Sequence, residues 1–224
     1  MCGRYTLRTR LNQLLDLYAA GSQIEWEPRF NIAPTQQVVA VRATPDADAR
    51  ELVLLRWGLV PFWADDPKIG NRMINARAET LAEKPSFKNA LKRRRCLILA
   101  DGVYEWRKEG TSKQPYFIHM KDDRPFALAG LWERWKKSDP PLETCTIVTT
   151  SANSLLSDLH DRMPVILTDA DAAVWLDPEI EQPEPLLSLL DPYPDDEMEA
   201  YPISTLVNSP KNETSKCIEP LESA

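Results

Sequence analysis

The apolar residues of this chain fall into short runs, and the segments between them are polar and rich in proline. Nineteen prolines and only seven glycines interrupt 224 residues, a density of breaks that argues against a helical bundle. Short apolar runs bounded by turn residues are typical of buried strands. Because the runs do not alternate strictly with helical segments, the pattern predicts a single α+β domain. We expect it to have a curved, mostly antiparallel, β-barrel-like sheet with short flanking helices.

Local patterns place the expected elements along the chain. A helix is predicted from Thr9, as its cap, to Gly21, which would end it. A long loop is predicted over 61–85, and the domain is expected to span 2–208, followed by a polar tail over 209–224. The other predicted helices are 86–95, 151–160, 169–176 and 184–190, and the predicted strands are 37–42, 52–60, 96–100, 102–106, 116–120, 126–132, 145–150, 164–167 and 201–207.

Several large classes of protein are disfavoured by composition and motif content. No apolar run reaches the length of a membrane span, and no secretory signal opens the chain, so no membrane partner and a cytoplasmic location are expected. Four cysteines show no C-x-x-C spacing and only two histidines accompany them, which predicts neither a metal site nor a disulfide framework. The common nucleotide, hydrolase and zinc-peptidase motifs are missing, and no cofactor is expected. Cys96 and Cys145 open apolar runs and are interpreted as buried hydrophobic residues.

The negative charge of the chain is concentrated at its end. The formal net charge is −7. Residues 1–110 hold 18 basic and 13 acidic side chains, 111–168 hold 7 of each, and 169–224 hold 2 basic against 14 acidic. A basic binding face on an acidic protein is compatible with this asymmetry. No motif explains the acidic final quarter.

The chain begins MCGRYTL, with a cysteine directly after the initiator methionine. An exposed thiol there is open to oxidation and has nothing to pack against. Position 2 is either arbitrary or reactive. Removal of Met1 would give Cys2 an α-amine and a thiol on adjacent carbons, and their ordinary pKa values of about 7.7–8.0 and 8.5 leave both partly nucleophilic at neutral pH.

Three further polar residues allow an ordinary and a functional interpretation. Glu105 in DGVYEW is either a surface glutamate beside Lys108 or a partly buried general acid or base. His160 follows a predicted helix, where it either caps the helix end or belongs to a site. Asn75 in INARAE is either a turn residue or an amide that orients a nucleophile.

Cationic and aromatic side chains suited to nucleic acid are also present. A guanidinium binds phosphate through two donors, and an exposed tryptophan can stack on a base. The alternative for the arginines is ordinary solvated surface, and the alternative for the tryptophan is the core. The basic run LKRRRC is more typical of a solvated face. The candidate phosphate ligands are Arg4, Arg72, Arg77 and Arg162, and the candidate stacking residue is Trp63.

Eight blocks of sequence together resemble one family. They are MCGRYTL, PRFNIAPTQ, RWGLVPFWA, MINARAET, DGVYEW, TIVTTSAN, HDRMPV and VNSPKN. Their order and combination over about residues 2–212 are similar to the SOS response-associated peptidase family, which includes abasic-site shielding proteins. The resemblance implies a β-barrel-like α+β domain with a positively charged groove for single-stranded DNA.

The resemblance also implies roles for individual residues. Cys2 resembles the nucleophile that forms a covalent thiazolidine link to an abasic site after Met1 removal, with weak lyase and self-processing activity as further expectations. The family's supporting residues match Asn75, Glu105 and His160, its phosphate contacts match Arg4, Arg77 and Arg162, and its aromatic wedge resembles Trp63. The expected partner is single-stranded DNA bound by a monomer. Two alternatives stay open: a thiol peptidase that uses Cys2, and a non-covalent single-strand-binding module.

Overall fold

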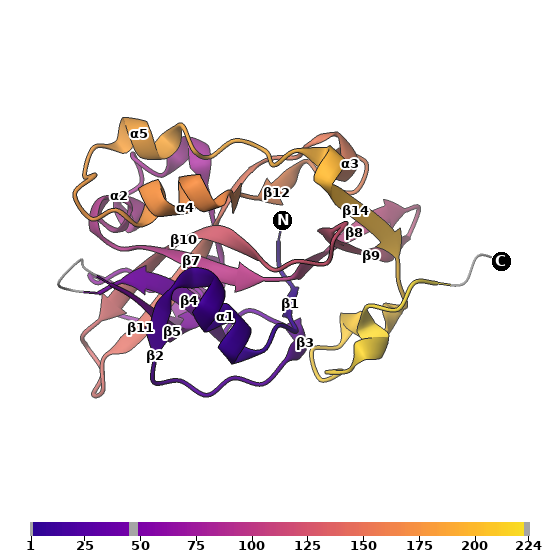
Figure 1. Ribbon diagram of the computed structural model, residues 1–224, viewed down its shortest axis with the longest axis horizontal. Helices are drawn as coiled ribbons and strands as arrows, with labels where there is room; N and C mark the ends of the chain where they lie inside the picture. Colours follow the sequence, from indigo (N-terminus) through magenta and orange to yellow (C-terminus); the bar gives the residue numbers. More distant parts are fainter. Residues whose placement is uncertain (1, 45–48, 222–224) are drawn as a thin grey trace.

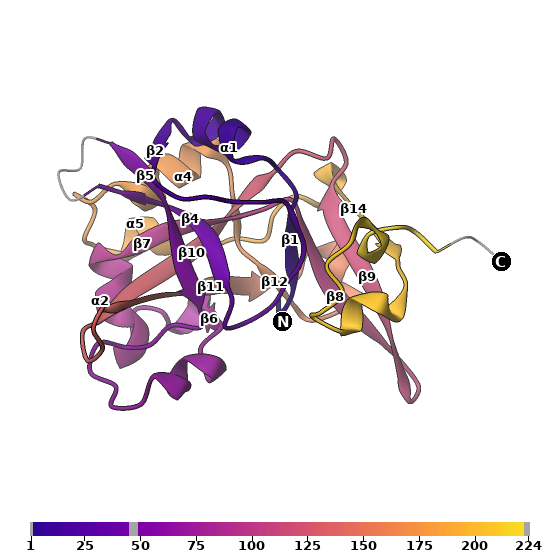
Figure 2. The ribbon, with the colours of Figure 1, turned by 90° about the horizontal axis from the view of Figure 1, so that it is seen from below.

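The computed structural model describes residues 2–44 and 49–221, and its strands form two sheets (Figures 1 and 2). Strands β1 to β14 are Tyr5–Leu7, Ala20–Ser22, Arg29–Ile32, Gln37–Ala43, Arg50–Trp57, Asn75–Arg77, Arg95–Ala100, Gly102–Glu109, Ser112–Met120, Phe126–Trp135, Leu142–Ser151, Arg162–Pro164, Ile166–Leu167 and Met198–Pro202. Helices α1 to α5 are Leu11–Tyr18, Pro85–Arg93, Ser154–Ser157, Asp169–Leu176 and Pro183–Leu187. The 3-10 turns η1 to η5 are Pro67–Arg72, Ala78–Thr80, Asp195–Glu197, Thr205–Asn208 and Ser215–Cys217.

The larger sheet closes into a five-stranded barrel. Its strands follow the order β5-β4-β7-β10-β11 through antiparallel pairs, and β11 then pairs in parallel with β5, with Thr144 opposite Arg56. Every residue of β7 is buried, because α2 and α4 cover its outer side while its inner side fills the barrel (Figure 1). Cys96 and Cys145 have no exposed surface, which confirms them as core residues. The predicted fold class, one α+β domain around a mostly antiparallel barrel, is confirmed.

The second sheet carries the start of the chain. Its strand order is β14-β9-β8-β1-β3, and β1 pairs antiparallel with both neighbours, so that Tyr5 lies opposite Val103 and Ile32. The ladder continues past β1, since the Tyr104 N–H donates to the carbonyl of Arg4 at 3.0 Å. Residues 2–4 therefore run along β8 toward Glu105.

The first helix begins and ends differently from the prediction. Thr9 is not its cap, because its N–H and hydroxyl both donate to the buried carboxylate of Asp101, at 2.9 and 3.0 Å. Arg10 takes the N-cap position instead. The helix ends at Ala19, which adopts a left-handed conformation with φ of 47°, and Gly21 already belongs to β2.

The predicted loop over 61–85 contains η1, β6, η2 and the start of α2. Gly58, at φ of 125°, meets Gly70 so closely that an added Cβ on Gly70 would lie 2.4 Å from the Gly58 carbonyl oxygen. This contact holds the loop against the end of β5. The turn between the predicted strands 37–42 and 52–60 includes residues 45–48, which lie outside the described residues.

The predicted polar tail is wrong for residues 209–221. Cys217 has no exposed surface, and the carboxylate of Glu213 accepts hydrogen bonds from the N–H groups of Phe30 and Asn31. The domain therefore extends past residue 208, because buried main-chain donors of β3 find their acceptor in this segment. The predicted strand over 201–207 is also shifted: β14 ends at Pro202 and η4 follows.

Candidate active site

Cys2 lies inside the protein, just before β1. Its exposed fraction is 1%, although residues at a chain end are ordinarily exposed. Burial, and after it the negative charge of Glu105, raise the pKa of the Cys2 thiol to about 12. The thiol is therefore protonated at neutral pH. Glu105 follows Tyr104, whose N–H donates to the Arg4 carbonyl, so β8 carries Glu105 alongside the segment of residues 2–4.

Asn75 holds the main chain at Cys2. Its Nδ2 donates a hydrogen bond of 2.7 Å to the Cys2 carbonyl oxygen. Asn75 is the first residue of β6, which pairs in parallel with β11, so the barrel determines its position. Its Oδ1 is buried and accepts no hydrogen bond from the described residues. That oxygen is free to accept a hydrogen bond from an amine or hydroxyl placed beside Cys2.

Glu105 is buried rather than solvated. It lies on β8 opposite Tyr116 of β9, and its exposed fraction is 7%. The interpretation as a surface glutamate is therefore wrong, whereas Glu109 at the end of the same strand is exposed. A buried carboxylate beside a protonated thiol is suited to proton transfer.

His160 and Glu105 line the same cleft, which has a volume of about 490 Å³. The main-chain N–H of Arg162 donates to His160 Nδ1 at 3.0 Å. Asp161 Oδ1 lies 2.6 Å from the same nitrogen, and a hydrogen bond between them would require a proton on Nδ1. The Asp161 carboxylate is exposed, however, whereas the main-chain donor of Arg162 is held in β12. We therefore assign Nδ1 as an acceptor in the neutral ring, so that Nε2 carries the proton.

Arg4 is already engaged within the protein. Its Nη1 donates to Asn31 Oδ1 at 2.8 Å and to the carbonyl of Val207 at 2.9 Å. Burial lowers the pKa of its guanidinium from the ordinary value. These bonds tie residue 4 to β3 and to η4, so Arg4 positions the segment that carries Cys2, and its role as a phosphate contact stays a prediction.

Arg77 and Arg162 flank the end of β11. Thr149 pairs with Arg77 of β6 on one edge of β11, while β12, which begins at Arg162, pairs on the other edge. Arg77 is exposed, and its side chain has no hydrogen bond or ion pair among residues 2–44 and 49–221. Arg162 instead donates to both oxygens of Glu79, with 3.0 Å between Nη2 and Oε2, and to the Thr149 carbonyl at 2.6 Å. Of these two, Arg77 is therefore open to a phosphate without rearrangement, as is the fourth candidate, Arg72, an exposed residue at the end of η1.

Trp63 is not among the residues that line this cleft. It belongs to the loop after β5, and its exposed fraction is 46%, so it is not the core residue that one interpretation allowed. No contact places it beside Cys2, and its role as a wedge stays a prediction. Sequence reasoning missed three cleft residues: Trp106, whose Nε1 donates to Asn208 Oδ1 at 2.8 Å, Asn208 itself, and Lys113. Trp106 and Asn208 lie in two of the quoted blocks, whereas Lys113 has no sequence signal.

The family model described as "SOS response associated peptidase (SRAP)" matches residues 1–210. The chain belongs to this family. It is 47% identical to the Abasic site processing protein YoqW of Bacillus subtilis, over 98% of this chain and 99% of that protein. It is 32% identical to the Abasic site processing protein YedK of Escherichia coli, over 99% and 100% of the two chains.

A solved structure agrees with the fold. A crystal structure of a protein from Bacteroides thetaiotaomicron superposes with a TM-score of 0.89 at 29% identity, covering 99% of this chain and 100% of that one. The Abasic site processing protein HMCES of Gallus gallus is 38% identical, over 79% of this chain and 60% of that protein. Abasic-site processing is thus the activity in the names of both bacterial and vertebrate relatives.

Residues 2–44 and 49–221 contain neither a candidate metal site nor a candidate membrane span. No group of three or more histidine, cysteine, aspartate or glutamate side chains there is placed to hold a metal ion. No helix in the same ranges is long and apolar enough to cross a membrane.

Proposed function

We propose that this chain processes abasic sites in single-stranded DNA by forming a covalent thiazolidine with Cys2, after removal of Met1. The observation that carries the proposal is that a buried Cys2 is held by Asn75 of one sheet while its segment runs along β8 of the other sheet, which carries Glu105. His160, in the cleft that Glu105 lines, supplies a further donor. Arg77, on one edge of β11, offers a cation to the strand that carries the lesion, and Arg162, on the other edge, does so once it leaves Glu79.

The reaction joins the ring-opened lesion, an aldehyde at C1′, to the aminothiol of Cys2. The α-amine nitrogen adds to C1′, and the carbonyl oxygen leaves as water, which gives an iminium ion. The thiol sulfur then bonds to C1′, and its proton is lost to a base while the nitrogen becomes an amine. One water is released and no oxidant is needed. Ring closure within one residue has a large entropic advantage over two separate nucleophiles.

Each neighbouring residue has a place in this reaction. Glu105 moves protons to and from the departing oxygen and the thiol. Asn75 holds the Cys2 main chain and accepts a hydrogen bond from the amine through Oδ1. His160 donates from Nε2 to the sugar or the adjacent phosphate. If the thiol does not close the ring, the iminium acidifies the C2′ protons, and strand cleavage by β-elimination follows as a weak lyase activity.

The raised thiol pKa favours this reaction over a thiol peptidase. A peptidase nucleophile is a thiolate, and its surroundings hold the thiol pKa below the ordinary value of about 8.5. In the chain that still carries Met1 the pKa of Cys2 is raised to about 12, so its thiol is protonated at neutral pH. In thiazolidine formation the thiol attacks only after the amine has formed the iminium ion. Because this attack is intramolecular, a protonated sulfur is sufficiently reactive. Cleavage after Met1 is then a single maturation step, for which self-processing is one route.

Mass spectrometry of the protein mixed with an abasic oligonucleotide tests the proposal. The expected adduct has the mass of the Met1-free protein plus the DNA minus one water. It should survive denaturation of the protein without prior reduction by borohydride. Cys2→Ala should abolish this stable adduct, while Cys2→Ser, which keeps the amine, should give only a Schiff base that needs reduction. Cys217→Ala is the matched control, because Cys217 is equally buried but lies in the C-terminal segment. A stable adduct with Cys2→Ala would overturn the proposal.

A further inference from the structure

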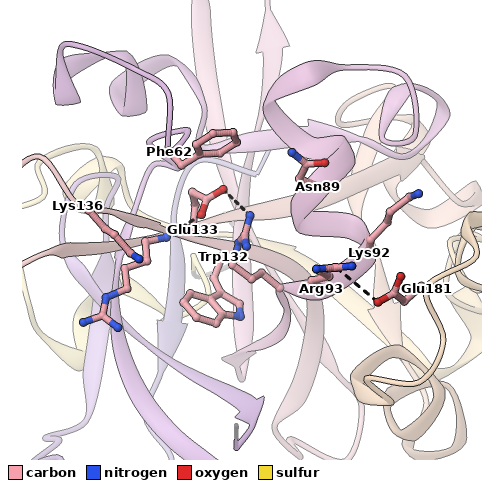
Figure 3. A pocket seen from close by; sticks show the side chains of 10 residues that line it. Phe62, Asn89, Lys92, Arg93, Trp132, Glu133, Lys136 and Glu181 are labelled. Carbon is pink, nitrogen blue, oxygen red and sulfur yellow. Dashed lines mark hydrogen bonds and ion pairs between the residues drawn. The ribbon is translucent and has the colours of Figure 1, made fainter.

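A groove of about 790 Å³, larger than the cleft of Glu105 and His160, lies between α2 and β10. Figure 3 shows Asn89, Lys92 and Arg93 on α2, with Phe62 and Trp132 to the left of them in this view. None of these residues belongs to the site described above. The charged residues that line the groove are Lys92, Arg93, Arg94, Arg134, Lys136, Glu133 and Glu181.

The groove is cationic after its internal pairs are counted. Five lining side chains are basic and two are acidic, which leaves a formal excess of three positive charges. Glu133 pairs with Arg94 at 2.9 Å and Glu181 with Arg93 at 3.4 Å. Lys92 and Lys136 form no ion pair with any residue in 2–44 or 49–221. Their charges are therefore available to an anion.

The run LKRRRC does not behave as one solvated face. Arg95 is turned inward, with an exposed fraction of 5%, and donates to the carbonyls of Leu91 and Lys92 at 2.7 Å. It thus satisfies the C-terminal carbonyls of α2. The remaining cations of the run, at positions 92–94, line the groove.

Two aromatic rings accompany these cations. Arg42 lies over the Trp132 ring, 4.4 Å from its centre, so the ring is held in place where it lines the groove. Phe62 is 47% exposed, an unusual position for a large apolar ring. Cations combined with aromatic rings are the usual surface for single-stranded nucleic acid, because phosphates meet the charges and bases stack on the rings.

The groove is continuous with the loop that carries Trp63. Phe62 and Trp63 are adjacent, and both rings are about half exposed. Their loop is anchored to the end of β10, since Trp135 Nε1 donates to the Ala64 carbonyl at 2.8 Å. A strand that stacks on Trp63 therefore has the groove directly beside it.

We propose that this groove binds the DNA strand flanking the lesion, with its cations on the phosphodiester backbone and with a base stacked on Phe62 or Trp132. This rests on the proposed function, which supplies the strand. The groove would lengthen the footprint of the protein without sequence preference, because phosphates and base faces are common to every sequence.

The test compares two double variants on undamaged single strands of about 4 and about 16 nucleotides, which bracket the site sizes of single-strand-binding domains. Lys92→Ala with Lys136→Ala removes the two unpaired groove charges. Lys121→Ala with Lys216→Ala removes two exposed charges elsewhere. On the long strand the groove variant should flatten the plot of log affinity against log salt by roughly 1.4, about 0.7 per lost contact. On the short strand its slope should match that of wild type.

The aromatic part has its own variant. Phe62→Ala should weaken binding of the long strand roughly tenfold, as expected for the loss of one stacked base. Leu17→Ala, which truncates another half-exposed apolar side chain, should change nothing. If the groove variants match their controls on the long strand, the groove proposal is overturned. Adduct formation by the wild-type protein on a short abasic strand is measured in parallel. If no adduct forms, the proposed function is overturned. The salt slopes on undamaged DNA then still decide whether the groove binds DNA.

Discussion

Asn75 Nδ2 donates a hydrogen bond of 2.7 Å to the main-chain carbonyl of Cys2. This bond joins the start of the chain to β6, which the barrel holds in parallel pairing with β11. It leaves Oδ1 of the same amide buried and without a donor among the described residues. One side chain therefore positions Cys2 and also offers an acceptor beside it.

Loss of the Asn75 amide should impair the positioning of Cys2 much more than the stability of the fold. Asn75→Ala removes one partly buried hydrogen bond, so we expect the free energy of unfolding to fall by only about 1 kcal/mol. Adduct formation should slow much more, because Cys2 is no longer held for ring closure. Denaturant unfolding and adduct time courses measure the two effects. Asn71→Ala, on the exposed side of η1, is the control, and equal adduct rates in the two variants would contradict the role of Asn75.

Glu105 should act through its charge. Glu105→Gln keeps the shape and removes the titrating group, so adduct formation should slow by about 10²- to 10⁴-fold. Affinity for undamaged DNA should stay near that of wild type. Pre-steady-state time courses over about pH 5–8 provide the measurement, with Glu109→Gln on the exposed end of β8 as the control. Superimposable time courses for wild type and Glu105→Gln would leave the aminothiol acting with solvent alone.

The Cys2 thiol should give a pH-dependent signature. Because its pKa is raised from 9.0 to about 12, the folded protein keeps a proton that the unfolded chain loses. The stabilisation from burying the neutral thiol is complete below pH 9.0, and it is lost as the pH rises toward about 12. Alkylation of Cys2 should therefore be slow at neutral pH and rise with pH, as mass spectrometry of the labelled peptide can measure.

The same experiment links Cys2 to Glu105. Glu105→Gln removes a negative charge that raises the pKa of the thiol, so Cys2 should become more reactive at a given pH. Cys96 in the barrel serves as the internal control, because burial and not Glu105 raises its pKa. An unchanged Cys2 alkylation rate in Glu105→Gln would show that the two groups do not interact.

The Arg162–Glu79 pair should compete with DNA. The hydrogen bond from Arg162 lowers the pKa of Glu79, so the pair persists at neutral pH and is lost only as the pH falls below the ordinary range of a glutamate. Glu79→Gln should release Arg162 to a phosphate. We expect tighter binding of undamaged single strands and a salt slope steeper by roughly 0.7. Glu83→Gln, an exposed glutamate before α2, should leave the slope unchanged.

Glu213 should behave as part of the domain. Its carboxylate accepts from two main-chain N–H groups of β3 and pairs with Arg29 at 2.7 Å. Glu213→Ala should lower the free energy of unfolding by about 2–3 kcal/mol, as is usual for hydrogen bonds to a charged group. Thermal and denaturant unfolding measure this loss, and Glu219→Ala, which is exposed, is the control. Equal stability of both variants would restore a free tail after residue 208.

Local sequence was sufficient for the long apolar strands of the barrel, whereas the short strands β1, β2, β3 and β6 were not predicted. Short apolar runs predict buried strands because each needs only its own side chains and flanking turns, and the runs at 96–100 and 126–132 became β7 and β10 of the barrel. Local capping patterns were less reliable. Thr9 has the side chain of a helix cap, but Asp101, more than ninety residues away, binds its hydroxyl and its N–H.

The sequence by itself determined the fold class, the unusual position of Cys2 and the set of residue types that the family uses. Only the tertiary structure decided which of these side chains are available. It buries Glu105 beside Cys2, leaves Arg77 open, and engages Arg4 with Asn31 and Val207. The physical reason is that burial and hydrogen-bond pairing depend on strand register between distant segments, whereas residue type and periodicity are local properties of the chain.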